Sequence, residues 1–133
     1  MSADKILEEL VQLSHDLGRE DRHMSILGEG NTSADLGDGT FWIKASGSQL
    51  GKIEASGFSR VRMDSVFELM EQKGLDNDQV NKGLEQTVTD PAHKRPSVES
   101  FLHALCLTDG GAKWVGHTHT VSVLQILCSK LGA

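Results

Sequence analysis

Two histidines separated by a single residue, His117 and His119, constrain this chain more than any other feature of its sequence. They follow a short apolar run at residues 113–115, which is entered through an Asp-Gly-Gly turn, so we expect a strand over residues 113–119. Successive side chains of a strand point to opposite faces, which puts both imidazoles on one face with Cα atoms roughly 6.5–7 Å apart. Rings at that separation can bind one divalent ion together. Two partly exposed histidines at a strand end would produce the same pattern, so the motif alone leaves both interpretations open.

The length of the chain suits one domain. Its 133 residues can bury a core without disulfides or a structural metal, and the composition, 38% hydrophobic and 24% charged, is typical of globular proteins. Cys106 and Cys128 both fall within apolar helical patterns, where a reduced thiol packs as a small hydrophobic group. We therefore predict one domain over residues 1–133, with both cysteines in its core.

Charge and hydropathy argue against some classes of partner. The net charge is −6 and there is no run of Lys or Arg, which disfavours a protein that acts mainly on nucleic acids or membrane surfaces. No apolar stretch reaches the roughly 20 residues of a membrane span, and the N-terminus lacks the apolar segment of a signal peptide. We expect a cytoplasmic protein without nucleic-acid or membrane partners.

Apolar residues at helical spacing predict four helices. The first ends at Gly18 and should pack one face on the core. The second runs from an N-cap at Asp64 to about Gly74. The third opens at residues 95–99, where Pro, Ser and Glu favour a helix start, and the fourth ends at Gly132. Their apolar residues are, in chain order, Ile6, Leu7, Leu10, Val11, Leu13 and Leu17; Val66, Phe67, Leu69 and Met70; Val98, Phe101, Leu102, Leu105 and Cys106; and Val121, Val123, Leu124, Ile126 and Leu127.

Strands and turns occupy much of the remaining sequence. Residues 24–35 predict a short strand, a glycine-rich turn and a second strand, and an Asp-Gly hairpin turn then leads to a strand at residues 40–44. That strand runs into a turn of small residues at 45–48. Residues 75–95 are polar, and we expect an irregular surface connection there with at most a short helix at residues 80–84.

The turns at residues 28–33 and 45–48 are rich in Gly, Ser, Thr and Asn. Free backbone N–H groups and small polar side chains suit a phosphate, which needs many donors and close approach of the backbone. Tight turns with no ligand would have the same composition. Ser97, at the predicted helix start, is a third possible donor, although helix capping explains it equally well.

Glu99 is the candidate acid or base. A carboxylate in the first turn of a helix is held ionised by the helix dipole, and beside a metal it could take a proton from carbon next to a carbonyl. A solvent-facing Glu that caps the helix is the alternative. His103 lies one helical turn further on, and we interpret it as a packing or orienting group. His15, His23 and His93 have polar neighbours in the sequence and are predicted to lie at the surface.

Four motifs, taken in chain order, resemble those of the class II aldolase/adducin family, with the rhamnulose-1-phosphate and fuculose-phosphate aldolase type nearest. They lie at residues 28–34, at 44–47, at 95–99 together with His103, and at 116–120. The resemblance implies a three-layer α/β fold with a central, largely antiparallel sheet flanked by helices. It also implies a homotetramer with active sites near its subunit interfaces.

The resemblance also implies roles for individual residues. His117 and His119 match the zinc ligands of the family, and Glu99 matches its acid/base. The implied function is a zinc-dependent lyase, which cleaves a ketose phosphate by a retro-aldol reaction through a metal-stabilised enediolate. The positions that match the family's contacts to the substrate phosphate are Asn31, Ser46, Gly47 and Ser97.

The chain departs from the family pattern at two places. Val98 stands where many members have a second Ser. The family also uses a third zinc-binding His well downstream of the two that match His117 and His119, and none follows before Ala133. We therefore expect an N-terminal portion of the fold, with weak zinc binding and no aldol cleavage by these residues alone. A pentulose-phosphate 4-epimerase, a dehydratase and a non-catalytic adducin-like binding module are the alternatives. Retention of both histidines with Glu99 favours an enzyme.

Overall fold

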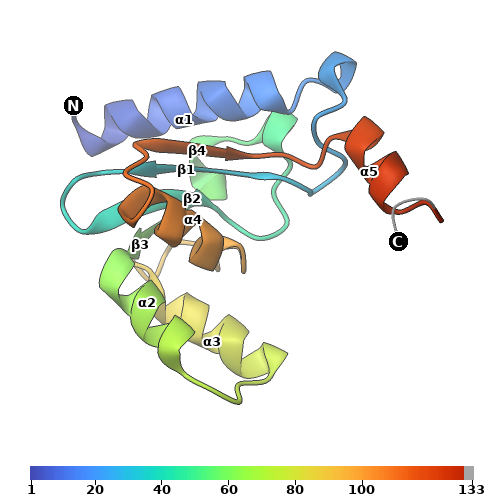
Figure 1. The fold of residues 1–133 in the computed structure, drawn as a ribbon. Helices are drawn as coiled ribbons and strands as arrows, with labels where there is room; N and C mark the ends of the chain where they lie inside the picture. The colour runs from blue at the N-terminus through green and yellow to red at the C-terminus, as the bar shows by residue number, and fades with distance from the viewer. Residues whose placement is uncertain (131–133) are drawn as a thin grey trace.

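The computed structural model describes residues 1–130, and an antiparallel sheet of four strands lies at the centre of the fold (Figure 1). The spatial order of the strands is β3-β2-β1-β4, so β4 forms one edge of the sheet. A hairpin joins β1 to β2 through Gly37 and Gly39, both with positive φ, as the Asp-Gly signal predicted. The strands are β1 (Asn31–Asp35), β2 (Thr40–Lys44), β3 (Phe58–Arg62) and β4 (Trp114–His117).

Helix α1 (Ala3–Leu17) covers one face of the sheet, as Figure 1 shows. The Ser2 side chain caps its first turn, and Gly18 ends it with a bond from its N–H to Ser14 O, which confirms the predicted stop. The apolar stripe of the helix meets sheet residues in one buried cluster. That cluster contains Ile6, Leu10, Ala34, Trp42, Ile53 and Phe58.

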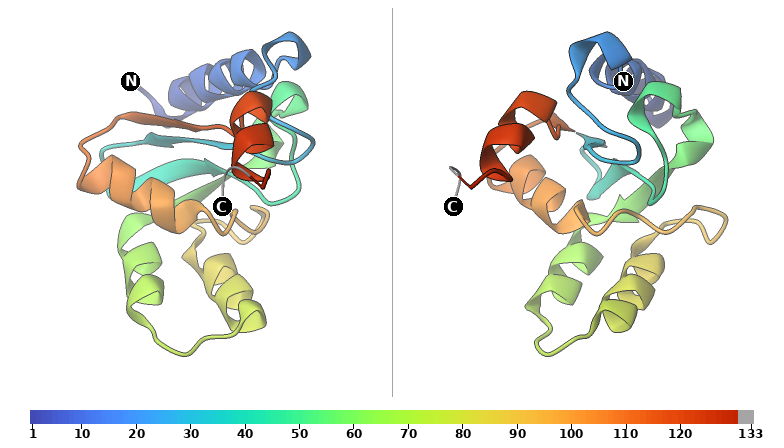
Figure 2. Two further views of the ribbon diagram at one scale, coloured as in Figure 1. Left: turned by 45° about the vertical axis from the view of Figure 1, so that its right-hand side comes forward. Right: turned by 90° about the vertical axis from the view of Figure 1, so that its right-hand side faces the viewer.

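Helices α2 (Met63–Glu71) and α4 (Ser100–Thr108) cover the opposite face. Side chains alternate along β2, so Phe41 and Ile43 point to this face while Trp42 points to α1. The two helices and the sheet share a second buried cluster, which contains Phe41, Ile43, Val61, Val66, Ala104 and Leu107. Helix, sheet and helix thus form the three layers that were predicted (Figure 2).

The polar segment at residues 75–95 forms a longer helix than predicted, α3 (Asn77–Thr87), which packs against α2. The prediction was wrong because few residues of α3 are apolar, so the sequence shows no clear helical periodicity there. A capping box starts the helix instead, since Asp76 accepts from Gln79 N while the Gln79 side chain accepts from Asp76 N. Buried Leu84 then fixes it to the core.

Two strand predictions also need correction. β3 was not predicted, although its sequence alternates apolar and polar residues. The short strand expected at the start of residues 24–35 does not form, because His23 and Leu27 have left-handed backbones with φ of 52°. β1 therefore begins only at Asn31, inside the glycine-rich motif.

Some boundaries differ as well. Arg62, and not Asp64, is the N-cap of α2, and the helix ends at Glu71, before Gly74. β4 ends at His117, and α5 (Val121–Leu127) follows a short connection. The last helix thus ends at Leu127, with Cys128 as its C-cap, before the predicted stop at Gly132, which itself lies outside the described residues. Short 3₁₀ turns at Glu20–Arg22, Leu50–Lys52 and Ala55–Gly57 complete the elements.

The two thiols lie in different surroundings. Cys106 is partly buried, but Cys128 is exposed at the end of α5, so the prediction that both belong to the core was wrong for Cys128. Its apolar neighbours in the sequence are exposed too. Among residues 1–130, no helix has both the length and the apolarity needed to cross a bilayer.

Candidate metal and phosphate site

Several chain segments end or begin at one end of the sheet. Asn31 starts β1 and pairs with His117 at the end of β4. β2 ends at Lys44, and an isolated bridge pairs the next residue, Ala45, with Pro96. This bridge brings the start of α4 beside the two small-residue turns. The motifs that lie far apart in the sequence therefore meet at a single place.

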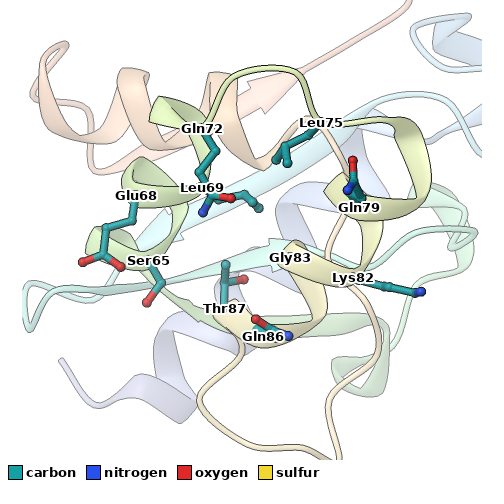
Figure 3. A pocket seen from close by; sticks show the side chains of 10 residues that line it. All are labelled: Ser65, Glu68, Leu69, Gln72, Leu75, Gln79, Lys82, Gly83, Gln86 and Thr87. Carbon is teal, nitrogen blue, oxygen red and sulfur yellow. The ribbon is translucent and has the colours of Figure 1, made fainter.

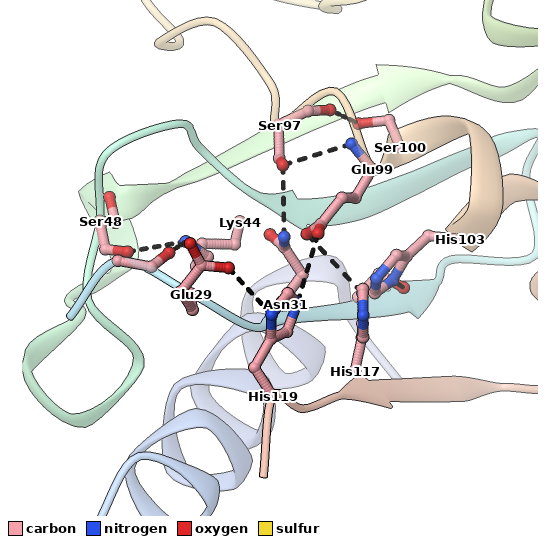
Figure 4. Close-up of polar contacts among 12 residues, drawn as sticks. Glu29, Asn31, Lys44, Ser48, Ser97, Glu99, Ser100, His103, His117 and His119 are labelled. Atoms are coloured by element: carbon pink, nitrogen blue, oxygen red, sulfur yellow. Dashed lines mark hydrogen bonds and ion pairs between the residues drawn. The ribbon is translucent and has the colours of Figure 1, made fainter. Parts of the chain in front are cut away.

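Glu99 faces both histidines of the His-x-His motif (Figure 4). Its Oε2 lies 3.7 Å from His117 Nδ1 and its Oε1 lies 3.7 Å from His119 Nε2. The centroids of the two imidazole rings are 4.9 Å apart. Glu99 is at the N-cap of α4, one position earlier than the first turn in which we expected it. All three side chains are about a quarter exposed, so the cluster is open to solvent.

The donor set fits a divalent cation. One ligand atom from each of the three residues lies within 4.8 Å of the others. A tetrahedral zinc with bonds of 2.0–2.1 Å has ligand atoms about 3.4 Å apart, and Glu99 lies 3.7 Å from each histidine nitrogen, through a different oxygen in each case. Among the residues that the structure describes, the buried side-chain nitrogen and oxygen atoms without a hydrogen-bond partner are Asn31 Oδ1, His103 Nε2, His117 Nδ1 and His119 Nε2. The histidine atoms that face Glu99 are therefore not held in hydrogen bonds with the described residues.

His103 is fully buried behind the histidine pair. Its Nδ1 lies 2.6 Å from Ser33 Oγ, and its ring centroid is 5.9 Å from that of His117. Burial, with a smaller contribution from His117, lowers the pKa of His103 to about 4, so the ring is neutral near pH 7. These contacts agree with the prediction that His103 packs and orients, and it is not one of the three grouped ligands.

The four predicted phosphate contacts line one hollow of about 150 Å³, next to Glu99. Ser97 Oγ accepts from Asn31 Nδ2 at 3.2 Å and from the backbone N–H of Glu99 at 3.3 Å. With two donors on its oxygen, Ser97 can still donate its hydroxyl proton to a ligand. Residues of both turns contribute to the lining, which consists of Gly28, Glu29, Gly30, Asn31, Lys44, Ser46, Gly47, Ser97, Val98 and Glu99.

The turn at residues 45–48 is only partly available for a ligand. The Ser46 N–H donates to Arg95 O at 3.0 Å, and Arg95 Nη2 donates to Ser46 Oγ at 2.9 Å. The expected free backbone donor at Ser46 is therefore already in use. Its hydroxyl proton remains available, and Gly47, with φ of +84°, keeps this corner open because it has no side chain.

Lys44 is a residue of the site that the sequence analysis did not single out. Its side chain is almost fully buried, and Nζ donates to Gly28 O at 2.9 Å and to Ser48 O at 2.7 Å. Burial lowers its pKa, while the charges of Glu99 and Glu29 oppose this change. Lys44 therefore joins the two turns and brings a positive charge to the hollow. The signal was its position at the end of an apolar strand, where an unpaired Lys is rare.

Glu29 is a second residue that the sequence analysis missed. Its Oε2 lies 2.9 Å from His119 Nδ1, the ring nitrogen that faces away from Glu99 (Figure 4). The residue lies in the Gly28-Glu29-Gly30 segment, which was interpreted as a phosphate-binding turn and a family motif, with no role for the Glu29 side chain. A carboxylate between two glycines, upstream of an expected metal site, was the available signal.

The remaining histidines lie outside the site. His23 is exposed, as predicted. His15 and His93 are partly buried, so the surface prediction was wrong for them. His15 Nε2 lies 2.7 Å from Ile53 O. His93 packs edge-on against Trp42 and accepts from the Arg60 N–H.

Another hollow, of about 420 Å³, lies between α2 and α3 (Figure 3). It is lined by Leu69, Leu75 and Gly83 with uncharged and charged polar side chains. A Cβ added at Gly83 would lie 2.4 Å from Leu69 Cδ1, so this glycine allows the two helices to approach. None of the buried unpartnered atoms in the described part of the chain is found here, and we assign it no chemistry.

Comparison with known proteins agrees with this assembly of motifs. The family described as the class II aldolase and adducin N-terminal domain matches residues 8–130. The chain belongs to this family. A protein of Bacillus subtilis named uncharacterized oxidoreductase YuxG is 32% identical to it over 96% of the chain, but the match covers only 19% of that relative.

Solved structures show the same fold. The N-terminal class II aldolase domain of a conserved protein from Thermoplasma acidophilum superposes with a TM-score of 0.77 and 30% identity, over 98% of this chain and 62% of that one. An L-fuculose 1-phosphate aldolase superposes with a TM-score of 0.62 and 18% identity, over 96% and 50%. At 18% identity the likeness concerns the fold alone. The family member described here thus spans part of each relative's length.

Proposed function

We propose that this chain carries the active-site residues of a zinc-dependent lyase, which cleaves a ketose phosphate by a retro-aldol reaction. The observation that supports the proposal best is the position of Glu99, 3.7 Å from an unpartnered nitrogen of each of His117 and His119. The adjoining hollow has hydroxyl, amide and ammonium groups that suit a phosphate. A metal pair and a phosphate hollow side by side match a substrate with an oxygen-rich carbon chain and a phosphate at one end.

The histidines would hold the metal. His117 offers Nδ1 and His119 offers Nε2, and imidazole nitrogen is a usual ligand of zinc. The ion supplies positive charge opposite the negative charge that builds up on substrate oxygens when the C–C bond breaks. The three side chains are about a quarter exposed, so the side of the cluster that faces solvent would have room for those substrate oxygens.

Glu99 is assigned the proton transfer at the carbon next to the substrate carbonyl. In the cleavage direction the hydroxyl group on the departing carbon loses its proton to solvent and that carbon becomes an aldehyde, the electron pair of the C–C bond passes to the carbon next to the carbonyl, and the carboxyl group of Glu99 gives that carbon a proton. In the condensing direction the same carboxylate takes the proton back. A Glu99 that instead bound the ion would lose this role, and Glu99→Gln distinguishes the two functions because only a ligand would take zinc with it.

The phosphate would lie in the hollow that adjoins Glu99. Ser97 and Ser46 can donate hydroxyl protons, and Lys44 supplies positive charge. Asn31 has an unpartnered Oδ1 in the present orientation. Its Nδ2 carries two protons, so besides the bond to Ser97 Oγ it can donate the second one to a phosphate oxygen.

The predicted homotetramer and cytoplasmic location remain proposals. β4 is the edge strand of the sheet, and on α5 the side chains of Val123, Ile126 and Leu127 are more than half exposed. An open edge beside apolar side chains supports assembly with further protein. The 4-epimerase and dehydratase alternatives would use the same metal and Glu99, while an adducin-like module would need neither.

The decisive experiment measures zinc and substrate binding together. The purified chain is stripped with a chelator, reloaded with zinc and analysed by mass spectrometry, and calorimetry then measures binding of L-rhamnulose 1-phosphate or L-fuculose 1-phosphate. We expect ketose-phosphate binding that depends on zinc and weakens in Ser46→Ala but not in the exposed control Ser56→Ala. A chain that binds no zinc even at high zinc concentration, or that binds the sugar phosphate equally well without it, would refute the proposal.

A further inference from the structure

We propose that Glu29 is a positioning residue for His119, whose ring it holds in the form that can bind a metal. The inference rests on the proposed zinc site and goes beyond it, because Glu29 lies outside the group of ligand atoms. Its Oε2 is 2.9 Å from His119 Nδ1, within the distance at which a ring N–H donates to a carboxylate. Nδ1 faces Glu29, while Nε2 faces Glu99 at 3.7 Å.

The proton on the ring decides whether His119 can be a ligand. A neutral imidazole carries one proton, so a proton held on Nδ1 leaves a lone pair on Nε2. Nε2 is buried and has no hydrogen-bond partner, which is the state that a metal ligand requires. With the proton on Nε2 instead, an N–H would point into the site and exclude a cation. A carboxylate at Nδ1 selects the first form.

The backbone brings Glu29 to this position from a distant part of the chain. The loop before β1 runs alongside the segment after β4, because the His119 N–H donates to Met24 O and the Val121 N–H donates to His23 O, each at 3.0 Å. A Cβ added at Gly30 would lie only 3.0 Å from His117 O. Gly30 thus permits the close approach that puts residue 29 beside the second histidine.

The turn that carries Glu29 is strained in a way that core packing does not explain. Leu27 has a φ of 52°, a conformation that costs an ordinary residue roughly 1–2 kcal/mol, yet its side chain is 79% exposed. The turn is closed by the Glu29 N–H, which donates to Ile26 O at 2.9 Å, and by Lys44, which donates to Gly28 O. Such strain is typical of segments that hold a functional group in place.

Folding stability alone gives no reason for the Glu29 contact. The Glu29 side chain is 57% exposed, and ion pairs at that exposure contribute little to stability. Removal of Glu29 should therefore change metal binding while the unfolding midpoint stays the same. This separation distinguishes a positioning role from a structural one.

The test compares zinc affinity in two variants and a control, with zinc alone as the probe in competition with a chromophoric chelator. We expect Glu29→Ala to weaken zinc binding by about 10–100-fold, the usual effect of losing such a partner. Glu29→Gln loses the charge but keeps an oxygen that can accept from Nδ1, so its loss should be clearly smaller. Glu54→Ala removes an exposed carboxylate elsewhere and should leave the affinity unchanged. Equal losses in the Ala and Gln variants would overturn the proposal, since charge alone would then account for them.

A second readout does not depend on metal. Nitrogen–proton NMR of the His119 ring in the metal-free protein should show the proton on Nδ1 in the wild type, with a shift toward Nε2 in Glu29→Ala. An unchanged ring proton, or unchanged zinc affinity in Glu29→Ala where His119→Ala loses zinc, would overturn this inference and leave the metal site standing. Failure of the wild-type chain to bind zinc would overturn the metal site itself, and this inference with it.

Discussion

Buried polar groups on the two faces of β1 differ in whether all of them have hydrogen-bond partners. On the face toward α1, Thr32 Oγ1 lies 2.6 Å from Ser14 Oγ, and Ser14 Oγ donates to Leu10 O at 2.7 Å. On the face toward α4, Asn31 Oδ1 and the neighbouring His117 Nδ1 have no hydrogen-bond partner. All of these groups belong to the same end of the same fold, and Asn31 and Thr32 are adjacent residues.

This difference shows what distinguishes a site from a core. Buried polarity occurs on both faces, so it does not by itself indicate a ligand. Unmet hydrogen-bonding capacity does, because leaving a buried donor or acceptor unpaired costs about 1–3 kcal/mol. The α1 face meets that requirement internally, while the α4 face pairs Ser33 with His103 but leaves other groups unpartnered, which in our proposal bind a metal and a substrate. Substitutions on the α1 face should therefore affect stability alone, while those on the α4 face should also weaken binding.

The largest effect is expected at the histidine pair. His117→Ala and His119→Ala should each abolish retained zinc, because a tetrahedral site loses one of few protein ligands with either substitution. The helices should stay folded, which circular dichroism can check while mass spectrometry measures the metal. His23→Ala is the matched control, since His23 is exposed outside the site. Zinc content equal to that of the wild type in both variants would show that the α4 face is an ordinary surface.

Glu99→Gln should have the next largest effect. In a family-length protein that carries these residues, turnover should fall by roughly 10²–10⁴-fold, the usual contribution of a positioned acid or base. Zinc content and phosphate affinity should be retained, because the amide is nearly the same size as the carboxylate. Loss of zinc in this variant would make Glu99 a ligand, and full turnover would make it only the residue that precedes α4.

Much of the fold followed from side-chain periodicity. α1 was predictable because Ile6 and Leu10 recur on one face of a helix with a clear stop at Gly18. α3 was not, because its start depends on a capping box and only Leu84 and Thr87 are buried. The segment before β1 was assigned by its apolar residues, yet Leu27 is exposed with a left-handed backbone. Periodicity predicts which residues are buried in regular helices and strands. It fails where turns and helix caps determine the course of the backbone.

The site was predictable where it coincides with motifs. Glu99, His117 and His119 come together as the resemblance implied, and Ser97 lines the same hollow as the other predicted phosphate contacts. Lys44 and Glu29 were missed for a physical reason. Their roles depend on where two irregular turns run relative to the sheet, and one sequence contains no periodic signal for that path.

The pH dependence of stability should reveal the neutral ring of His103. Its pKa is about 4 in the folded protein and near 6.5 when unfolded, so between these values the unfolded chain binds the extra proton. Stability is then fully present above about pH 6.5 and falls as the pH drops toward 4, by up to about 3 kcal/mol. Denaturant unfolding across this range should show a steeper slope in the wild type than in His103→Gln. Identical slopes would mean that His103 is protonated in the native state.

The smallest effect is expected on the α1 face, and it completes the comparison. Ser14→Ala removes the partner of Thr32 Oγ1 in a fully buried position, which should lower the free energy of unfolding by about 1–3 kcal/mol. Zinc affinity should not change, because the hydroxyl pair lies across the sheet from Glu99 and the histidines. Asn31→Ala, one residue from Thr32, removes the unpartnered Oδ1 but also the Nδ2 that donates to Ser97 Oγ, so it should lower the free energy of unfolding by about 1 kcal/mol and also weaken binding of a ketose phosphate. Denaturant titration measures the free energy of unfolding of both variants, and calorimetry measures zinc binding by Ser14→Ala and ketose-phosphate binding by Asn31→Ala. If Ser14→Ala weakened zinc binding as much as it lowered stability, metal binding would depend on the whole fold and not on one face of β1.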